Sequence, residues 1–334
     1  MVGRLVYGRR STHRFPPLPN NHELARIRAS LNGYFHPDDW IIFTLMHDAP
    51  NNPARNPPIG LIAGEGEFPK LVARGARRTG RTVTIVALKG YADPQLRELA
   101  DSIYWRGVVQ LGRWIRVFRN AGCREIVMAG RVRKSAMFAG PRWLQWLQYL
   151  PDLTSIRVWY RHAKDKRNDT LLSAVADEMA RRGLTLVDST KYCPEALIEP
   201  GVLTSGLVPP AVLADADFAW PLIKQIGALD IGQSIAVKEK EVIAVEAIEG
   251  TDRCIARAGE LCPQGGWTLV KVAKPDQDMR FDVPAIGPQT IENLHKARAG
   301  GLVVEAGKTL LLEREKTLAL AAKYKIALIG RKDS

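Results

Sequence analysis

The sequence predicts an α/β protein with an N-terminal doubly wound (Rossmann-like) domain and a C-terminal α+β domain. Three observations support this fold class. Short apolar runs alternate with helical segments from residue 59 onward, 334 residues suit about two domains, and 46% hydrophobic with 25% charged residues is ordinary globular composition. The expected parts are an extension (1–58), a Rossmann-like domain (59–193), a linker (194–210) and a C-terminal α+β domain (211–331).

Residues 1–58 differ from the rest of the chain in composition. They hold four of the six histidines and are rich in Pro and Asn, which predicts a poorly ordered extension with one short helix near 21–31. The Arg-rich start resembles a transit peptide without its apolar region or small-residue cleavage site. A start codon assigned too far upstream explains the segment equally well.

The first domain is predicted from strands and helices that alternate along the chain. An apolar strand over 59–63 leads through a Gly-rich turn into a helix that begins near Pro69 and ends at Gly80. The strand over 82–88 completes a βαβ unit with parallel strands. Helices over 109–120 and 169–182 and strands over 125–129 and 184–187 continue the pattern. Ligands of such sheets bind beyond the carboxyl ends of the strands.

The composition changes at residues 194–210, where several Pro and Gly residues predict a linker. The second domain is expected to follow this linker. Its predicted helices cover 218–229, 288–299 and 314–324, with another opening after 249–252, and its predicted strands cover 234–237, 242–247, 267–273, 302–305, 310–312 and 327–329.

The segment GLIAGEGEFP places Gly60, Gly64 and Gly66 around the first strand-to-helix turn. Glycines let backbone N–H groups approach an anion, and a helix N-terminus adds positive potential. A nucleotide diphosphate on this turn is one interpretation, and a tight turn that needs positive φ is the other. The spacing is not GxGxxG and no acidic residue ends the second strand, which disfavours NAD.

Two acidic segments in the second domain are candidates for chemistry. In AVEAIEGTD, Glu246, Glu249 and Asp252 open a helix, where carboxylates serve either as caps or as ligands of Mg²⁺ or Mn²⁺. The segment KVAKPDQDMRFDVPAIGPQT lies between prolines and is expected to be an irregular loop. It is either a salt-bridged corner or a catalytic loop that handles phosphate, and its acidic and basic side chains are Lys271, Lys274, Asp276, Asp278, Arg280 and Asp282.

Residues 131–167 interleave aromatic and basic side chains, including Trp143, Trp146 and Trp159. This mixture suits a membrane interface, a lipid substrate or single-stranded nucleic acid, and a core helix with a solvated basic face explains it as well. The net charge of +13 favours anionic partners. Four cysteines without a CxxC spacing predict neither a disulfide framework nor a zinc site, and no apolar run is long enough to span a membrane.

Several of these motifs, in this order and at these intervals, resemble the UDP-2,3-diacylglucosamine pyrophosphatases of the LpxI type, from lipid A biosynthesis. The resemblance covers residues 59–331, and it implies that 59–193 form a UDP-binding domain and 211–331 a catalytic domain. Its carriers are IGLIAGEGEFP, VALKGYADPQL, VMAGRVRK, NDTLL, LDIGQS, AVEAIEGTD and KPDQDMRFDVPAIGPQT. The family usually has three consecutive glycines where this chain has Gly64-Glu65-Gly66. It usually has an Arg-Pro pair after the third strand, where this chain has Arg133-Lys134-Ser135, and Gly-Asp-Asp where this chain has Arg167-Asn168-Asp169.

The resemblance implies a cytoplasmic enzyme, peripheral to the inner membrane, that hydrolyses its substrate to UMP and 2,3-diacylglucosamine 1-phosphate with Mg²⁺ or Mn²⁺. The implied partners are this substrate and an anionic membrane surface, without nucleic acid, and a homodimer would not be surprising. The catalytic candidates are Asp282, Asp278, Arg280 and Lys274. The substrate-binding candidates are Gly60, Gly64, Glu65, Gly66, Arg131, Thr251 and Gln277. The metal candidates are Asp282, Asp278, Glu246 and Glu249.

Two other functions remain open from the sequence. A nucleotide-dependent oxidoreductase would use the Gly-rich turn, although the missing acid after the second strand disfavours it. A non-enzymatic protein that binds nucleic acid or lipid would use the basic, Trp-rich segment. That alternative leaves the acidic loop without a purpose, because carboxylates repel a polyanion.

Overall fold

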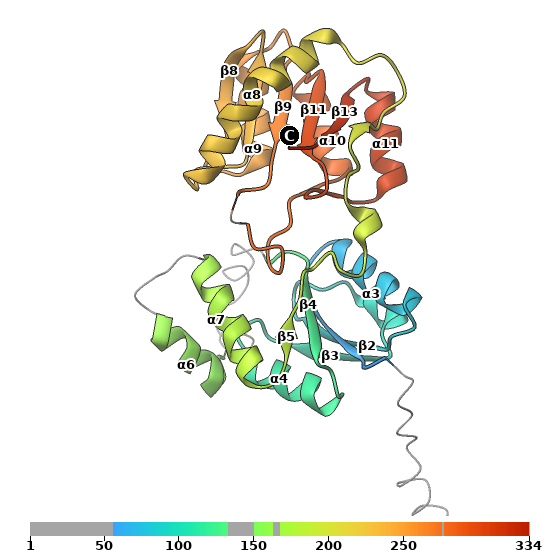
Figure 1. Ribbon diagram of the computed structural model, residues 1–334, viewed down its shortest axis with the longest axis vertical. Helices are drawn as coiled ribbons and strands as arrows, with labels where there is room; N and C mark the ends of the chain where they lie inside the picture. Colours follow the sequence, from blue (N-terminus) through green and yellow to red (C-terminus); the bar gives the residue numbers. More distant parts are fainter. Residues whose placement is uncertain (1–55, 133–149, 163–167, 276, 334) are drawn as a thin grey trace, which may run out of the picture. The chain divides into compact units, whose positions relative to one another are not determined.

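Figure 1 shows the computed structural model of the protein, in which two separate sheets each carry packed helices. The structure describes residues 56–132, 150–162, 168–275 and 277–333. Nearly all of the expected N-terminal extension, with its short helix, lies outside these ranges, as do Trp143, Trp146 and Asp276. Residues 55–334 form one compact unit. Within the described ranges, no helix combines the length and apolar character needed to cross a bilayer.

Among the described residues, the N-terminal sheet has five parallel strands in the order β3-β2-β1-β4-β5. Ile59 of β1 pairs with Val83 of β2 on one side and with Glu125 of β4 on the other. The strands are β1 (Ile59–Ala63), β2 (Val83–Leu88), β3 (Ser102–Arg106), β4 (Glu125–Ala129) and β5 (Thr185–Leu186). Around them lie α3 (Phe68–Arg78), the 3-10 helix η1 (Pro94–Leu99), α4 (Leu111–Asn120), α6 (Leu153–His162) and α7 (Asn168–Arg181).

Both faces of the N-terminal sheet are buried, and this explains why its central strands are continuously apolar. Leu61 packs in a core that contains Val72 of α3. The next residue, Ile62, packs in a second core with Phe118 of α4 and Met179 of α7. The predicted doubly wound arrangement is therefore confirmed, because helices cover the sheet on both sides.

The glycines predicted to stop helices do so by adopting left-handed backbone conformations. Gly80, Gly122 and Gly183 follow α3, α4 and α7 with φ of 74°, 72° and 79°. Strand β3 and helix α6 are among the elements that were not predicted. The outermost strand β3 is only half-buried, so its sequence SIYWR lacks the apolar run of a central strand, and α6 lies within the segment that was interpreted by composition alone.

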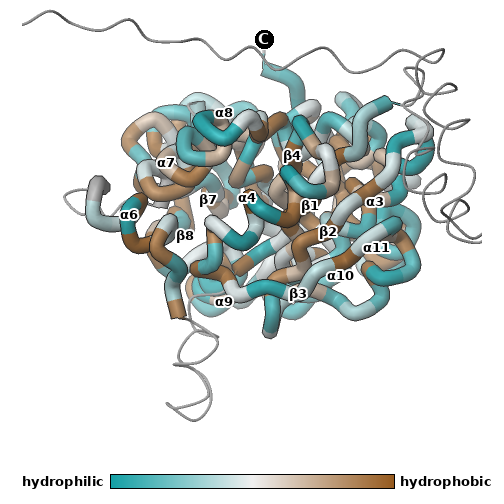
Figure 2. The backbone as a smooth tube through the Cα atoms, turned by 90° about the horizontal axis from the view of Figure 1, so that it is seen from below, coloured by the Kyte–Doolittle hydropathy of each residue, from teal (hydrophilic) through white to brown (hydrophobic). Residues whose placement is uncertain are grey.

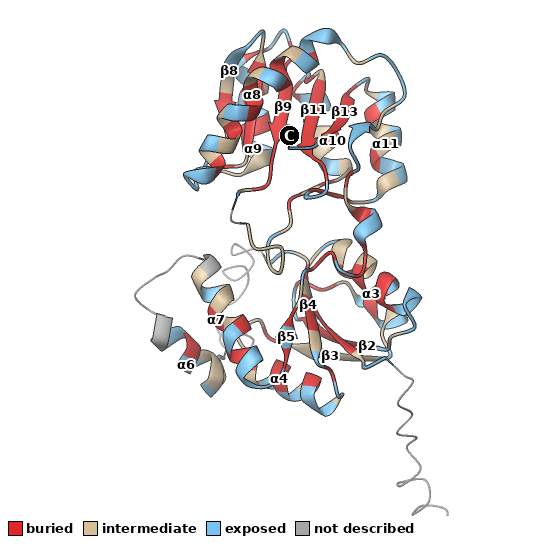
Figure 3. Ribbon diagram, viewed as in Figure 1, coloured by how far each residue is buried: buried red, intermediate tan, exposed pale blue. Residues whose placement is uncertain are grey.

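The C-terminal sheet, within the described ranges, has six strands in the order β6-β13-β11-β9-β7-β8. Strands β9, β11 and β13 are parallel, whereas β6, β7 and β8 pair antiparallel. The strands are β6 (Gly201–Val202), β7 (Ser234–Lys238), β8 (Glu241–Val245), β9 (Thr268–Lys271), β11 (Gly301–Glu305) and β13 (Ala327–Arg331). Figure 3 shows these central strands largely buried.

Helices cover this second sheet on both faces as well. Val270 and Val303 pack under α8 (Pro210–Ala228), whereas Leu269 and Leu302 pack under the other three helices. Those are α9 (Thr251–Leu261), α10 (Pro288–Lys296) and α11 (Arg314–Lys323). A short parallel pair, β10 (Ala285–Ile286) with β12 (Leu310–Leu311), stands apart from the sheet. The expected further sheet with helices is thus present in the C-terminal half.

The segment expected to be a linker contains ordered elements. It includes the 3-10 helix η3 (Pro194–Ala196) and β6, which pairs antiparallel with the final strand β13. Helix α8 begins at Pro210, eight residues before the predicted start at 218, since a proline in the first turn needs no hydrogen-bond donor.

The four cysteines are free and buried, and burial raises the pKa of Cys123, Cys193 and Cys254 to about 11.

Candidate active site

The acidic loop that follows β9 is held at the carboxyl end of the N-terminal sheet by Ser189. This residue is fully buried and comes soon after β5. Its hydroxyl lies 2.6 Å from the carbonyl oxygen of Met128, near the end of β4, and 2.9 Å from the carbonyl oxygen of Arg280 in the loop. Its backbone N–H also donates to the carbonyl oxygen of Met279 at 3.0 Å. One serine therefore ties the loop to the end of β4.

Apolar side chains of the same loop pack against the N-terminal sheet. Phe281 contacts the core that contains Ile62 and Phe118. Val283 contacts the opposite core, which contains Leu61 and Val72. The loop touches the cores on both faces of the sheet, so its position is determined by packing as well as by hydrogen bonds.

Asp278 and Arg280 form a closed pair within the loop. The guanidinium Nε lies 2.9 Å and 3.0 Å from the two carboxylate oxygens, and Nη2 lies 2.6 Å from Oδ2. The backbone N–H of Arg280 adds a third donor at 3.0 Å. This pairing lowers the pKa of Asp278 and raises the pKa of Arg280. Asp278 is consequently a charged structural partner of Arg280 in this arrangement.

Of the loop carboxylates that the structure describes, Asp278 and Asp282, only Asp282 is exposed. Its Oδ2 accepts a hydrogen bond of 2.7 Å from Gln277 Nε2, and Gln277 Oε1 in turn accepts from the Lys274 backbone N–H at 2.9 Å. The Lys274 ammonium pairs with Asp230. Gln277 thus orients Asp282 while leaving this carboxylate open to a ligand.

A buried polar cluster lies at the end of β9, next to the start of α9. Lys271 is 4% exposed, and its Nζ donates to Thr251 Oγ1 at 2.9 Å. Thr251 Oγ1 donates to Glu246 Oε2 at 3.0 Å, and Glu246 is also buried. Burial lowers the pKa of Lys271, while Glu246, Asp282 and Asp252 oppose this shift through their charges. Lys271 is therefore joined to Glu246 through the hydroxyl of Thr251. The negative charge of Asp282 also acts on the Lys271 ammonium.

The Gly-rich turn and the end of β4 are joined by backbone hydrogen bonds. Glu65 and Arg131 exchange two N–H···O bonds of 2.9 Å, and the Gly64 N–H donates to the Ala129 carbonyl oxygen at 2.8 Å. A Cβ at Gly64 would lie 2.8 Å from the Arg131 carbonyl oxygen. Gly66 has φ of 105° and open space beside it. Close approach therefore explains Gly64, and backbone conformation explains Gly66.

The structure assigns Gly60 a packing role. It lies within buried β1, and a Cβ there would come within 2.4 Å of Ile126 and 2.6 Å of Phe118. Its contribution to a ligand site is indirect, because it lets α4 approach the sheet.

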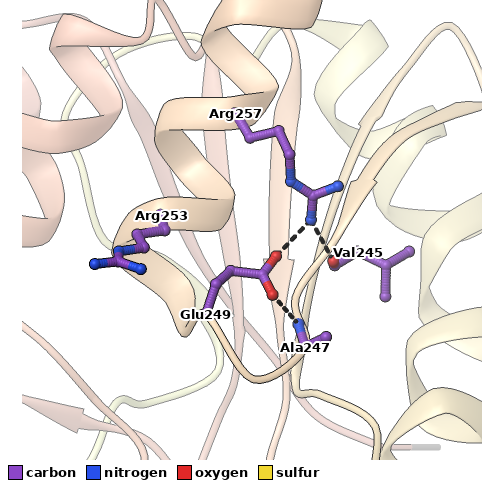
Figure 4. A pocket seen from close by; sticks show the side chains of 5 residues that line it. All are labelled: Val245, Ala247, Glu249, Arg253 and Arg257. Carbon is purple, nitrogen blue, oxygen red and sulfur yellow. Dashed lines mark hydrogen bonds and ion pairs between the residues drawn. The ribbon is translucent and has the colours of Figure 1, made fainter.

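Figure 4 shows that Glu249, in the loop before α9, is bound to Arg257 of α9 and to the backbone of its own loop. It accepts hydrogen bonds from Arg257 Nη2 and from the Ala247 backbone N–H. Asp278 is bound to Arg280 and Glu246 to Thr251, so the four metal candidates do not form one ligand set. Within the described residues, no three Asp, Glu, His or Cys side chains are grouped to hold a metal ion.

The structure brings most of the other candidates to one edge of the N-terminal sheet. Ser189 is bound to the carbonyl oxygens of Met279 and Arg280 in the loop and to that of Met128 in β4. The Gly64 N–H donates to the next β4 carbonyl oxygen, that of Ala129. This edge lies where the strand order turns from β1 to β4, the switch point at which doubly wound sheets bind ligands. Thr251 lies instead in the cluster at the end of β9.

Ser189 was not predicted from the sequence to belong to this region. Lys271 was predicted as part of the acidic loop, but its buried contact with Thr251 was not. A lysine that ends an apolar strand was a usable signal for Lys271, since such a position is buried. Ser189 carries no local signal.

Comparison with known proteins gives a consistent result. The family model described as LpxI N-terminal domain matches residues 58–196, and the LpxI C-terminal domain matches residues 199–329. A relative from Caulobacter vibrioides, named UDP-2,3-diacylglucosamine pyrophosphatase LpxI, is 32% identical over 279 residues, covering 81% of this chain and 96% of the relative.

Similarity to solved structures is weak. The biotin carboxylase complex from Campylobacter jejuni is 14% identical, with a TM-score of 0.22, and the match covers 64% of this chain and 44% of that chain. The biotin carboxylase subunit of pyruvate carboxylase is 12% identical, with a TM-score of 0.23 and coverage of 63% and 41%. Matches at this level carry no argument about the site.

Proposed function

The chain belongs to the LpxI family, and on that premise we propose that it is an enzyme that hydrolyses the pyrophosphate bond of UDP-2,3-diacylglucosamine in lipid A biosynthesis. The products are UMP and 2,3-diacylglucosamine 1-phosphate. The match to both family domains and the printed activity of the Caulobacter relative support this proposal.

One structural observation carries the proposal for the site. The acidic loop of the C-terminal half is bound through Ser189 to the end of β4, beside the Gly-rich turn. A ligand at this edge would meet the backbone of the turn and the side chains of the loop together. That combination suits a nucleotide diphosphate whose reacting bond is the pyrophosphate.

The turn is suited to the uridine diphosphate. Helix α3 has no acidic side chain in its first turn and no side-chain cap at its start. Pro69 has no N–H and the Lys70 N–H donates to the Glu67 carbonyl oxygen, so the Phe68 N–H and the positive potential of the helix start are what this N-terminus offers an anion. Arg131, which is exposed beside the turn, adds a positive side chain.

We assign the proton-accepting role to Asp282. Water would attack one phosphorus atom, the bridging P–O bond would break, and the bridging oxygen would leave on the other phosphate. A carboxylate near the attacking water accepts its proton. Asp282 is exposed and held by Gln277, whereas Asp278 is bound to Arg280. Arg280 and Lys274 supply positive charge for the phosphates.

Dependence on Mg²⁺ or Mn²⁺ stays a prediction. The described carboxylates do not form a preassembled ligand set. The roles proposed above for Asp282, Arg280 and Lys274 are stated without a bound metal ion. Action at an anionic membrane surface also stays a prediction and fits a diacylated substrate, while a homodimer is compatible with the sequence.

A turnover assay tests the proposed function. Purified full chain is mixed with UDP-2,3-diacylglucosamine in detergent, and UMP release is followed with Mg²⁺, with Mn²⁺ and with EDTA. We expect UMP release by the wild type, and a loss of at least about a hundredfold in Asp282→Asn with folding intact. Asp217→Asn is the matched control, because Asp217 is an exposed partner of Arg331. Absence of release from a folded wild type under all three conditions refutes the proposal, and screening then turns to other UDP-sugars and NAD(P).

A further inference from the structure

Three aliphatic side chains stand exposed at the edge of the C-terminal sheet from which the acidic loop departs. Leu229 is 71% and Ile231 50% exposed, and Ile248 is fully exposed. The first two lie in the loop between α8 and β7, and the third lies in the loop between β8 and α9. Figure 2 shows hydrophobic stretches all along the chain, so what distinguishes these three residues is their exposure. We call them the aliphatic patch.

The two loops that carry the aliphatic patch lie against each other. A Cβ at Gly232 would come within 1.9 Å of the Glu246 carbonyl oxygen, so the chain beside Ile231 touches the chain that leads to Ile248. Strand β7 begins beside the ends of both β8 and β9, which places the two loops at one edge of the sheet. Exposed aliphatic residues on adjoining loops form a patch that marks a binding surface, whereas single ones are ordinary.

Hydrogen bonds fix the backbone of both loops. Glu249, the residue after Ile248, is bound to Arg257 of α9 and to the backbone of its own loop. The Ile231 N–H donates to the Ile226 carbonyl oxygen at 3.3 Å. The aliphatic patch is therefore held in place by the fold, and its loops need little further ordering when an apolar ligand binds.

The aliphatic patch adjoins the residues proposed for the reaction. Asp230, in the middle of the first loop, pairs with the Lys274 ammonium. A Cβ at Gly227 would lie 3.7 Å from Lys274 Cα, so the end of α8 also packs against the start of the acidic loop. Gln277 joins the Lys274 backbone N–H to the Asp282 carboxylate. A substrate held at Asp282 therefore has an exposed apolar surface beside it.

An open hollow of about 620 Å³ lies next to Ile248 (Figure 4). Its lining residues are Val245, Ala247, Glu249, Arg253 and Arg257. Ala247 and Glu249 stand on either side of Ile248 in the chain, so this hollow continues the aliphatic patch. Its volume is in the range of ligand sites in proteins. The stems of arginine side chains cover apolar groups while their charged ends stay in water, so the two arginines are compatible with an apolar ligand.

We propose that the aliphatic patch and the hollow beside it bind an acyl chain of the substrate and set the preference of the enzyme for chain length. The inference deepens the proposed function and rests on it for the identity of the ligand. In UDP-2,3-diacylglucosamine the first acyl chain is attached next to the sugar carbon that carries the pyrophosphate. With the pyrophosphate at Asp282, this chain runs over Ile231 and Ile248 into the hollow.

The dependence of turnover on chain length tests the proposal. UMP release in detergent is measured with a dodecanoyl and with a butanoyl form of the substrate. In Leu229→Ser/Ile248→Ser we expect the ratio of kcat/KM between the two substrates to fall at least about tenfold, because each buried methylene group contributes to binding. Leu261→Ser is the matched control, since Leu261 is 61% exposed and is the last residue of α9.

Melting temperatures near that of the wild type confirm that both variants are folded. An unchanged ratio in the double variant overturns the proposal, and an equal loss of kcat/KM for both substrates assigns the two residues to the shape of the acidic loop instead. A fall of the ratio in Leu261→Ser as large as that in the double variant also overturns the proposal.

Photo-crosslinking separates this inference from the proposed function. The probe is 2,3-diacylglucosamine 1-phosphate with a diazirine at the end of the acyl chain on position 2, and mass spectrometry locates the label. We expect labelling within residues 229–231 and 245–257 that excess unlabelled product suppresses. Labelling confined to other parts of the chain overturns the inference. A wild type that is labelled there but releases no UMP refutes the proposed function and leaves the acyl-chain site intact, whereas absence of both refutes both.

Discussion

Replacing Ser189 by alanine should slow turnover without unfolding the protein. The substitution removes a fully buried hydroxyl that lies 2.6 Å from the Met128 carbonyl oxygen and 2.9 Å from the Arg280 carbonyl oxygen. The backbone bond from position 189 to Met279 remains. The loop is therefore loosened at one of its polar anchors while its apolar contacts persist.

The size of the effect follows from the loss of one O–H donor, which the carbonyl oxygens of Met128 and Arg280 share. Leaving a buried polar group without its partner costs about 1–3 kcal/mol. If the position of the loop against β4 is destabilised by that free energy, and turnover requires this position, the rate falls by about 5- to 150-fold, at about 1.4 kcal/mol per tenfold. We expect the change in kcat, with KM altered little, because Ser189 is proposed to position the loop rather than to touch substrate.

The assay is UMP release at saturating substrate in detergent, with thermal melting in parallel. Ser155→Ala is the matched control, since that hydroxyl joins α6 to the start of α4, far along the chain from the loop. Wild-type kcat in Ser189→Ala would refute the positioning role. An equal loss of kcat in Ser155→Ala would show that any loss of stability, rather than loop position, lowers the rate.

Three further predictions concern stability. Gly60→Ala should destabilise the fold by about 1–3 kcal/mol, measured by urea unfolding, because its Cβ would overlap Phe118; an unchanged midpoint contradicts the packing role. Lys271→Met should cost about 3–5 kcal/mol by leaving Glu246 buried without its nearby positive charge, and adding Glu246→Gln should recover part of that loss. Hydrogen bonding from a tyrosine hydroxyl, then lysine and arginine partners, lowers the pKa of Glu125 from 4.5 to about 2. This stabilisation is present above pH 4.5 and is lost as the pH falls towards 2, so Glu125→Gln should show a flatter decline over that window than the wild type.

Much of the fold was predictable because local signals agree with burial. The runs over β1, β2 and β4 are apolar since both faces of the sheet are covered, and the glycines after α3, α4 and α7 take left-handed conformations. Strand β3 was missed because an edge strand needs no apolar run. The start of α8 at Pro210 was missed because its prolines also suit a linker.

The candidate site was predictable in its residues but not in its contacts. Glycines, carboxylates and arginines mark the turn and the loop, since their chemistry is visible in the sequence. Asp278 is paired with Arg280, whereas Asp282 is held by Gln277. This difference between the two carboxylates depends on the path of the loop. The role of Ser189 depends on a contact between positions 91 residues apart. No local pattern records such a contact.

The place of β13 in its sheet has a consequence for how the protein is made. β13 lies between β6 and β11, so the C-terminal sheet cannot close until residues 327–331 have left the ribosome. All strands of the N-terminal sheet are synthesised by residue 186, and domains generally fold as units during synthesis. The nascent chain can therefore form the glycine turn before the loop with Asp282 has been synthesised. The order of synthesis thus makes docking of this loop a later event than formation of the turn.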